Sequence, residues 1–244
     1  MSRRTDFHIA NAVAALSAAP DPKACLRIFR RAIAPFKIDS FACGEVDLAA
    51  PERTVFYAID WPDSYRRFYF GNGLSQRDPL LEALKGRHEP LTWSELQRDR
   101  KQWSAIGTRA LQVIAEHGWT DGLAVPIPRG DQRFGLVSLQ AGKRRAFDAD
   151  DKSALAMLSY CLHERLRNLA PKYGFAIPPV GLTGREIDAL RLIARGATDR
   201  DVARKLGIAP STAHEHIEKA KLKLQVSTRA EAIAIAVSLA IVAP

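Results

Sequence analysis

The last quarter of the chain carries alternating helix start and stop signals, which leave little freedom in how it can fold. Thr183 and Glu186 have the spacing of a capping box at a helix start, and Gly196 is suited to end that helix. Thr198 then repeats the start signal, and Gly207 repeats the stop. The spacing predicts two short helices joined by a tight turn.

A third helix is predicted from Pro210, because proline is well tolerated in the first turn of a helix. Apolar residues recur on one face of this helix, and polar residues occupy the other. The inward positions are Ala213, Ile217, Ala220 and Leu224, and the outward ones are His214, Glu215, Glu218, Lys219, Lys221 and Lys223. The arrangement indicates a helix-turn-helix motif.

A fourth helix is predicted from Ser227 to Val242, and after Glu231 it consists almost entirely of Ala, Ile, Val and Leu. A domain this small cannot bury all of that apolar surface by itself. We therefore expect a second copy of the chain to cover it as a homodimer, through Ile233, Ala236 and Leu239.

A proline- and glycine-rich segment separates this region from the rest of the chain. Residues 170–181 hold three prolines and two glycines in twelve positions, a composition that favours neither a helix nor a central strand. The four tryptophans all precede this segment, and no aromatic residue follows Phe175. We predict a first domain over residues 1–169, a linker over 170–181 and a second domain over 182–244.

The first domain alternates helical and strand patterns, so its predicted class is α+β. Helices are expected over 6–18, 21–35, 62–70, 77–86 and 104–117, strands over 40–48, 54–59, 122–128 and 134–141, and a long final helix after Phe147. The final helix carries a leucine stripe at positions 155, 158, 162, 166 and 169. The simplest architecture is an α-β-α sandwich around a mainly antiparallel sheet.

Composition adds only broad limits. The net charge of +9 invites a polyanionic partner, but the second domain holds only 10 basic against 7 acidic residues, so most of the excess lies elsewhere. No signal peptide or membrane-spanning run is apparent, and the three widely spaced cysteines fit reduced thiols better than a disulfide framework or a metal site. We expect a cytoplasmic protein with no membrane association, metal or cofactor.

Residues 182–244 closely resemble the DNA-binding domain of LuxR-type transcription regulators. The matching motifs are Leu182-Thr-x-Arg-Glu186-x-x-x-Leu190, Gly196-x-Thr198, Val202-Ala203-x-x-Leu206-Gly207-Ile208, Ser211-Thr212-Ala213-x-x-His216-Ile217 and Lys223-Leu224-x-Val226. The resemblance implies that the third helix enters the major groove of double-stranded DNA and that a dimer reads a palindromic site.

The resemblance also implies which residues contact DNA. Base contacts fall to His214 and Glu218, with Glu215 nearby, because a histidine N–H can donate to a purine acceptor and a carboxylate can accept from cytosine N4. The phosphate-contacting positions are Thr198, Ser211, Thr212 and Lys223. The sequence departs from the family pattern at Ala209, where a capping serine is usual, and at Glu218, where some relatives carry arginine.

The first domain resembles the autoinducer-binding domain of quorum-sensing members of the same family. The motifs are Trp61-Pro62-x-x-Tyr65-x-x-x-Tyr69, Asp78-Pro79, Trp93, Gly118-x-x-x-Gly122, Pro126 and Phe134-Gly135-x-x-Ser138-Leu139. The resemblance implies a small-molecule signal such as an N-acyl homoserine lactone, bound in a mostly apolar site. In that site Asp78 accepts the ligand amide N–H, Tyr69 and Trp93 wall the head group, and the Ser138 hydroxyl approaches the amide.

One departure bears directly on the ligand. Family members commonly show tyrosine at the first position of the Trp61–Tyr65 motif and tryptophan at the second, where the indole N–H donates to the lactone carbonyl. Here the two residues are exchanged, and a tryptophan can donate but not accept. Three outcomes stay open: the lactone shifts, the ligand is a modified one such as an aromatic-acyl lactone, or it is not a lactone. A regulator that acts without ligand is a further alternative.

An enzyme is a third hypothesis, and it rests on Cys161 and His163. Two residues apart on a helix, these side chains face different directions, and no acid is placed to orient the histidine. The sequence therefore favours a non-enzymatic regulator.

Overall fold

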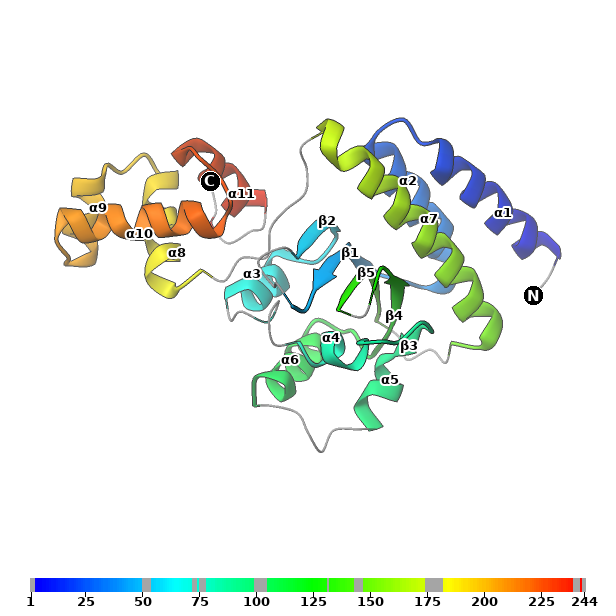
Figure 1. The fold of residues 1–244 in the computed structure, drawn as a ribbon. Coiled ribbons are helices and arrows are strands. Elements are labelled where there is room, and N and C mark those ends of the chain that lie inside the picture. Colours follow the sequence, from blue (N-terminus) through cyan, green and yellow to red (C-terminus); the bar gives the residue numbers. More distant parts are fainter. Residues whose placement is uncertain are drawn as a thin grey trace. The chain divides into compact units, whose positions relative to one another are not determined.

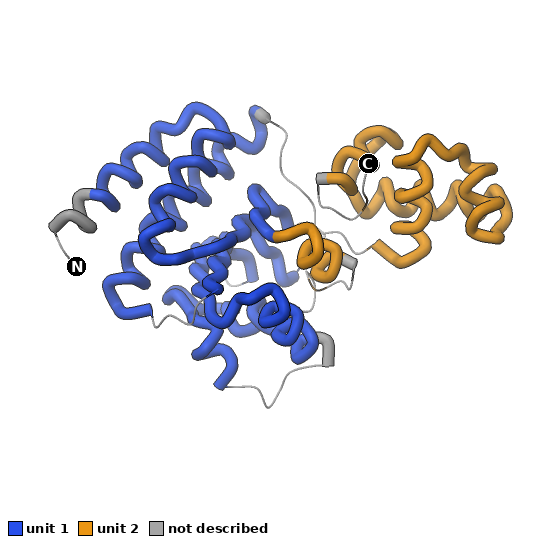
Figure 2. The backbone as a smooth tube through the Cα atoms, turned by 180° about the vertical axis from the view of Figure 1, so that it is seen from behind, with its two compact units in different colours: residues 1–61, 79–176 blue, residues 62–78, 177–244 orange. Residues whose placement is uncertain are grey.

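The computed structural model describes residues 3–49, 54–71, 74, 78–98, 105–130, 132–142, 147–173, 182–238 and 242. The chain divides into two compact units, Met1–Trp61 with Pro79–Ala176 and Pro62–Asp78 with Ile177–Pro244 (Figure 2). The second unit thus takes in residues 62–78, which the sequence analysis placed in the first domain. The units are described separately below.

The first unit is built on an antiparallel sheet of five strands in the order β2-β1-β5-β4-β3 (Figure 1). Their bounds are β1 Ser40–Asp47, β2 Val55–Ile59, β3 Leu91–Thr92, β4 Asp121–Pro128 and β5 Arg133–Ala141. The strands predicted over 40–48, 54–59, 122–128 and 134–141 are confirmed. Strand β3 was not predicted, because two residues are too short to show a period-two pattern.

The longer helices of this unit lie close to their predicted positions, whereas α5 was not predicted. They are α1 Arg3–Ala18, α2 Pro22–Ile33, the short η1 Ala34–Phe36, α4 Pro79–Ala83, α5 Trp93–Leu96, α6 Ala105–Glu116 and α7 Ala149–Tyr173. Helix α7 passes Pro171 and ends at Tyr173, so it extends into the segment predicted as a linker. A proline in the last turn removes only one hydrogen bond of the helix, which explains why the helix tolerates it there. The remaining linker positions, 174–181, lie outside the described residues.

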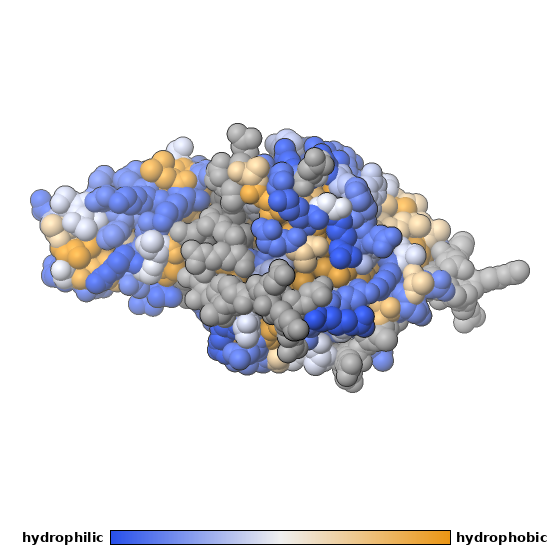
Figure 3. Space-filling view, turned by 60° about the horizontal axis from the view of Figure 1, so that its bottom comes forward, coloured by the Kyte–Doolittle hydropathy of each residue, from blue (hydrophilic) through white to orange (hydrophobic). Residues whose placement is uncertain are grey.

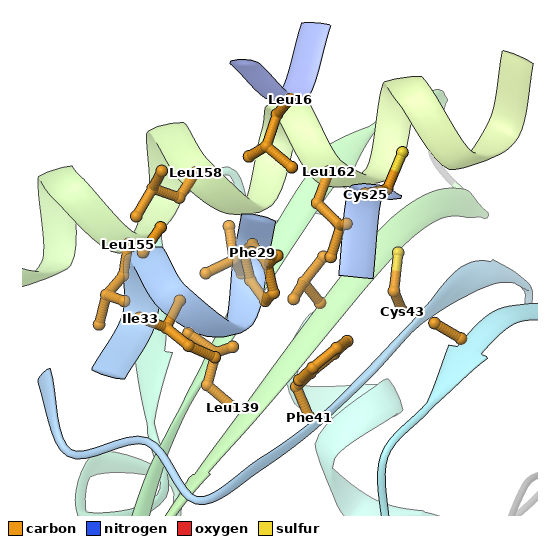
Figure 4. Close-up of a cluster of buried hydrophobic side chains, with 14 of the residues drawn as sticks. Leu16, Cys25, Phe29, Ile33, Phe41, Cys43, Leu139, Leu155, Leu158 and Leu162 are labelled. Carbon is orange, nitrogen blue, oxygen red and sulfur yellow. The ribbon is translucent and has the colours of Figure 1, made fainter. Parts of the chain in front are cut away.

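One face of the sheet packs against α1, α2 and α7 through the main hydrophobic core (Figure 4). Leu155, Leu158, Leu162 and Leu166 of α7 are fully buried, which confirms the predicted leucine stripe. They meet Phe29 from α2 and side chains of the central strands. Among these is Cys43, and burial raises the pKa of its thiol far above the usual range.

The opposite face of the sheet carries a second, smaller core. Leu80, Leu81 and Leu84 from α4 and the turn after it, and Leu96 from α5, pack there with residues such as Phe134 of β5. Helices therefore cover both faces of the antiparallel sheet, and the predicted α-β-α sandwich is confirmed.

The second unit contains α3 Asp63–Gly71 and the carboxy-terminal helices α8 Gly184–Ala194, α9 Asp199–Leu206, α10 Pro210–Lys223 and α11 Arg229–Ser238. Thr183 and Thr198 each cap a helix through a complete capping box. Gly196 and Gly207 adopt φ values of +81° and +66°, which lie in the left-handed region that ends helices. The predicted starts and stops of the first two helices are thus confirmed.

The predicted inward face of the third helix is also confirmed, since Ala213, Ile217, Ala220 and Leu224 are all buried. No helix in the described part of the chain combines the length and apolarity that a membrane span requires.

A neighbouring pair on α7 tests how much the main core contributes to stability. Leu158 is fully buried and Met157 is 53% exposed. We expect Leu158→Ala to lower the free energy of unfolding by about 2–5 kcal/mol, because it removes buried methyl groups and leaves a cavity. Met157→Ala is the matched control and should change it by less than about 0.5 kcal/mol. Urea unfolding followed by tryptophan fluorescence measures both, and equal effects would show that α7 does not form the core.

Candidate functional site

Two of the predicted ligand-binding residues are joined by a third residue that the sequence analysis did not select. The indole Nε1 of Trp61 donates to Oε1 of Gln140 over 3.2 Å. Nε2 of Gln140 in turn donates to Oγ of Ser138 over 2.9 Å. All three residues are buried, with 7%, 2% and 7% of their surface exposed. We call this series the Trp61–Gln140–Ser138 chain.

The strands on either side of β5, β1 and β4, carry small residues opposite Ser138 and Gln140. Ser138 lies opposite Ala42 of β1 and Ala124 of β4. Gln140 lies opposite Ser40 and Gly122 on the same two strands. Directly opposite residues project from the same face of a sheet, so Ser138 has only methyl groups on either side.

Trp93 is the first residue of α5, and its ring lies against Gly122, the residue of β4 opposite Gln140. Thr92 caps this helix in a capping box, and both the backbone N–H and the hydroxyl of Ser94 donate to the buried carboxylate of Asp121. The Trp93 ring lies against the backbone of Gly122, where a Cβ would approach it to 2.7 Å. Glycine at this position therefore makes room for the indole.

Electrostatics strengthen the cap of α5. Partial burial works to raise the pKa of Glu95, but hydrogen bonds from Thr92 and from Nζ of Lys152 outweigh it and lower the pKa to about 2. The carboxylate is therefore charged at neutral pH and fixes the helix that carries Trp93.

The other three predicted ligand-binding residues come together in the second unit. The hydroxyl of Tyr69 donates to Oδ2 of Asp78 over 3.2 Å, and the rings of Tyr65 and Tyr69 lie 6.0 Å apart. Burial, with the nearby charge of Asp78, raises the pKa of both tyrosines well above the usual range. Both therefore keep their hydroxyl protons at neutral pH and can donate them.

Six predicted ligand residues thus form two groups, each within its own unit: Trp61, Trp93 and Ser138, and Tyr65, Tyr69 and Asp78. Sequence reasoning missed Gln140 and Asp121. Gln140 lies two positions after Ser138 on one strand, so alternation along β5 places both side chains on the same face and could have indicated it.

A polar pocket of about 380 Å³ lies beside α5 and is lined by Ser94, Gln97, Arg98 and Thr120. None of the six predicted ligand residues is among these described lining residues. A pocket so polar suits an acyl chain poorly.

The pair considered for catalysis does not form a nucleophile and base. Burial lowers the pKa of His163 to about 4, and its ring is packed so tightly against Gly135 that a Cβ there would approach Nε2 to 2.5 Å. Burial also raises the pKa of the Cys161 thiol, which disfavours the thiolate that catalysis would need.

The predicted DNA-reading helix is α10, and its first turn lacks a side-chain cap because Ala209 occupies the cap position. His214 is exposed on this helix, and its Nδ1 lies 2.9 Å from Oδ2 of Asp199 at the start of α9. The other carboxylate oxygen of Asp199 accepts from Nη1 of Arg229 over 2.6 Å. The hydrogen bonds from His214 and Arg229 lower the pKa of Asp199, so the carboxylate that orients His214 stays charged.

Two lysines of α10 form ion pairs with the two glutamates that are predicted to lie near the bases. Nζ of Lys219 lies 2.5 Å from Oε1 of Glu215, and Nζ of Lys221 lies 2.8 Å from Oε2 of Glu218. Such pairs at the surface are weak, so each glutamate can exchange its lysine for a base amine at little cost.

The predicted phosphate contacts differ in their surroundings. Ser211 is exposed and Thr212 half-buried in the first turn of α10, while Thr198 serves as the cap of α9. Nζ of Lys223 lies 2.8 Å from Oε2 of Glu186, a buried carboxylate that also caps α8. Hydrophilic residues cover most of the visible surface of this helical region, at the left in Figure 3.

The three residues predicted to form the dimer contact are not equivalent. Ile233 is half-buried and Ala236 is fully buried within α11, while Leu239 lies outside the described residues.

Two family models match the chain. The model described as "Autoinducer binding domain" matches residues 21–166, and that described as "Bacterial regulatory proteins, luxR family" matches residues 180–236. The first alone covers more than half of the sequence and includes the segment 62–78. The chain therefore belongs to the LuxR family of transcription regulators, with an autoinducer-binding domain followed by a helix-turn-helix DNA-binding domain.

Named relatives agree with this assignment. The transcriptional activator protein LuxR of Aliivibrio fischeri is 23% identical over 169 residues, which cover 67% of this chain and 65% of the relative. The activator AnoR of Acinetobacter nosocomialis is 23% identical over 177 residues, covering 70% of this chain and 71% of AnoR. The alignment with LuxR thus spans slightly less than two thirds of that relative.

Solved structures share the fold. Escherichia coli SdiA matches with a TM-score of 0.53 and 15% identity, covering 97% of this chain and 98% of SdiA. CepR2 from Burkholderia cenocepacia, described as an N-acylhomoserine lactone dependent LuxR family factor, matches with a TM-score of 0.54 and 17% identity, covering 68% of this chain and 97% of CepR2.

The contact between Asp199 and His214 leads to a prediction about base reading. We expect Asp199→Asn to reduce discrimination between a selected DNA site and a scrambled duplex by roughly three- to ten-fold, because His214 loses the charged partner that orients it. Affinity for the scrambled duplex should not fall, since a negative charge is removed.

Asp188→Asn is the matched control, because it makes the same charge change at a side chain 42% exposed on α8. Fluorescence anisotropy at one fixed salt concentration measures both duplexes. Identical changes in the two variants would show that Asp199 acts only through its charge.

Proposed function

We propose that this chain is a cytoplasmic, ligand-responsive transcription regulator that binds an N-acyl homoserine lactone-like signal and then reads a palindromic DNA site as a homodimer. The observation that carries the ligand part is the Trp61–Gln140–Ser138 chain, which places buried polar groups beside small residues of the neighbouring strands. A few convergent polar groups in apolar surroundings are typical of a site for a small amphipathic molecule.

In this proposal the signal contacts Trp61, Tyr65, Tyr69, Asp78, Trp93 and Ser138. Asp78 accepts the amide N–H of the signal, and Tyr69 already donates to the same carboxylate, which helps to orient it. Trp93 supplies an apolar wall whose position Gly122 permits.

A second candidate is a LuxR-type regulator of a non-lactone molecule. Two observations favour it: the exchange of Trp61 and Tyr65, and the engagement of the Trp61 indole by Gln140. One SdiA structure, with a TM-score of 0.50 and 14% identity, is described as a complex with octanoyl-rac-glycerol, which is not a lactone. A regulator that works without ligand is the remaining alternative.

For DNA binding, we propose that α10 enters the major groove. His214, Glu215 and Glu218 face the bases, while Thr198, Ser211, Thr212 and Lys223 face phosphates. Dimerisation would use the last helix of the sequence, through Ile233, Ala236 and Leu239.

Ligand dependence is the direct test of the proposed function. We expect N-octanoyl homoserine lactone in the culture to raise the soluble yield, because a ligand that binds only the folded chain adds about 2.7 kcal/mol of stability at 100 times its Kd. Since the tryptophans lie in residues 61–119, quenching of their fluorescence as the lactone is added reports binding in the autoinducer-binding domain. A chain equally soluble, protease-resistant and competent to bind DNA without any signal would instead support the ligand-free alternative.

Restoring the family order of the two aromatic residues separates the lactone from the non-lactone candidate. We expect Trp61→Tyr/Tyr65→Trp to strengthen the response to straight-chain acyl lactones by roughly ten-fold, about the effect of one good hydrogen bond. Trp119→Tyr is the control, since this buried ring stacks on His117 and is not one of the proposed ligand contacts. A reporter gene or tryptophan quenching measures the response. An unchanged lactone response would mean that residue 65 does not face the lactone.

A further inference from the structure

The hydrogen bonds of the Trp61–Gln140–Ser138 chain have a fixed direction. An indole N–H can only donate, so the group of Gln140 that faces Trp61 must be its carbonyl oxygen. The amide nitrogen of Gln140 then faces Ser138 and donates to its Oγ. Because Ser138 accepts this bond, its own hydroxyl hydrogen is left for donation to another group.

The hydrogen bonds of the Trp61–Gln140–Ser138 chain are also costly to break. Gln140 is only 2% exposed, so water cannot readily replace its partners. A ligand that recruited the Trp61 N–H would leave the carbonyl of Gln140 buried without a donor, which costs about 1–3 kcal/mol. The indole of Trp61 is therefore better used as a wall of the site than as a donor to the signal.

We propose that Gln140 is a positioning and specificity-determining residue of the ligand site. It retains the Trp61 N–H within the protein and occupies one lone pair of the Ser138 hydroxyl, which leaves the hydroxyl hydrogen to donate to an acceptor oxygen of the carbonyl class on the signal. This inference rests on the proposed ligand-binding function, and it assigns to Gln140 a role that it exerts through Ser138.

The first experiment needs no ligand. In a ¹⁵N-labelled chain, the indole N–H signal of Trp61 is assigned by its loss in Trp61→Phe. We expect Gln140→Met, which keeps the length of the side chain but has no amide, to shift this signal and speed its exchange with solvent at least ten-fold. Ser138→Ala should leave it in place, because the bond from Trp61 to Gln140 is intact.

Gln132→Met is the matched control, because Gln132 is exposed in the turn before β5. An unchanged Trp61 signal in Gln140→Met would overturn the inference. Should Gln140→Met fail to fold, Gln140→Leu provides the same test.

The second experiment asks whether Gln140 acts through Ser138. The probes are N-octanoyl homoserine lactone and an analogue in which the acyl carbonyl is reduced to a methylene group. We expect Ser138→Ala and Gln140→Met each to weaken binding of the lactone by roughly ten-fold. The double variant should bind the lactone no more weakly than either single variant. The analogue should bind the wild-type protein and all variants with equal affinity.

Additive losses in the double variant, or equal losses with the carbonyl-free analogue, would overturn the role assigned to Gln140. If the wild-type protein binds neither probe, the proposal of an acyl-lactone ligand is contradicted. The indole N–H resonance of Trp61 in Gln140→Met would still show whether the hydrogen bond between Trp61 and Gln140 exists.

Discussion

Coverage of both faces of the central sheet is the constraint on which the rest of the first unit depends. Strand β1 is buried along its whole length, and helices cover either side of it. Every polar side chain on these strands must therefore find its partner inside the protein. Glu45 meets this demand through Arg133 and Arg167, whose charges outweigh the effect of burial and lower the pKa of the carboxyl. Gln140 meets it through Trp61 and Ser138.

The two faces of the sheet consequently serve different purposes. The face toward α7 is filled largely by leucine and phenylalanine side chains, and Cys25 and Cys43 are buried thiols within it. The other face combines a smaller apolar core with oriented polar groups beside small residues. The proposed small-molecule site lies on this second face, where Trp61, Gln140 and Ser138 supply buried polar groups held by hydrogen bonds.

The helix-turn-helix region could be predicted almost completely from the sequence, and the ligand site only in part. Caps such as Thr183 and Thr198 act within three residues, so their effect can be seen in a single window. The partner of Gln140 is 79 positions away, and that of Lys223 is 37 positions away. Such contacts depend on strand order and helix packing, which no local pattern records.

The hydrogen bond between Trp61 and Gln140 also limits how this sensor can evolve. A change at either position alone leaves a buried donor or acceptor without its partner, so each single step passes through a less stable chain. The two positions should therefore vary together among relatives, and lineages that carry tyrosine at the first position are free to lose the glutamine. Signal preference in this branch would then change by paired substitutions rather than by gradual drift at one residue.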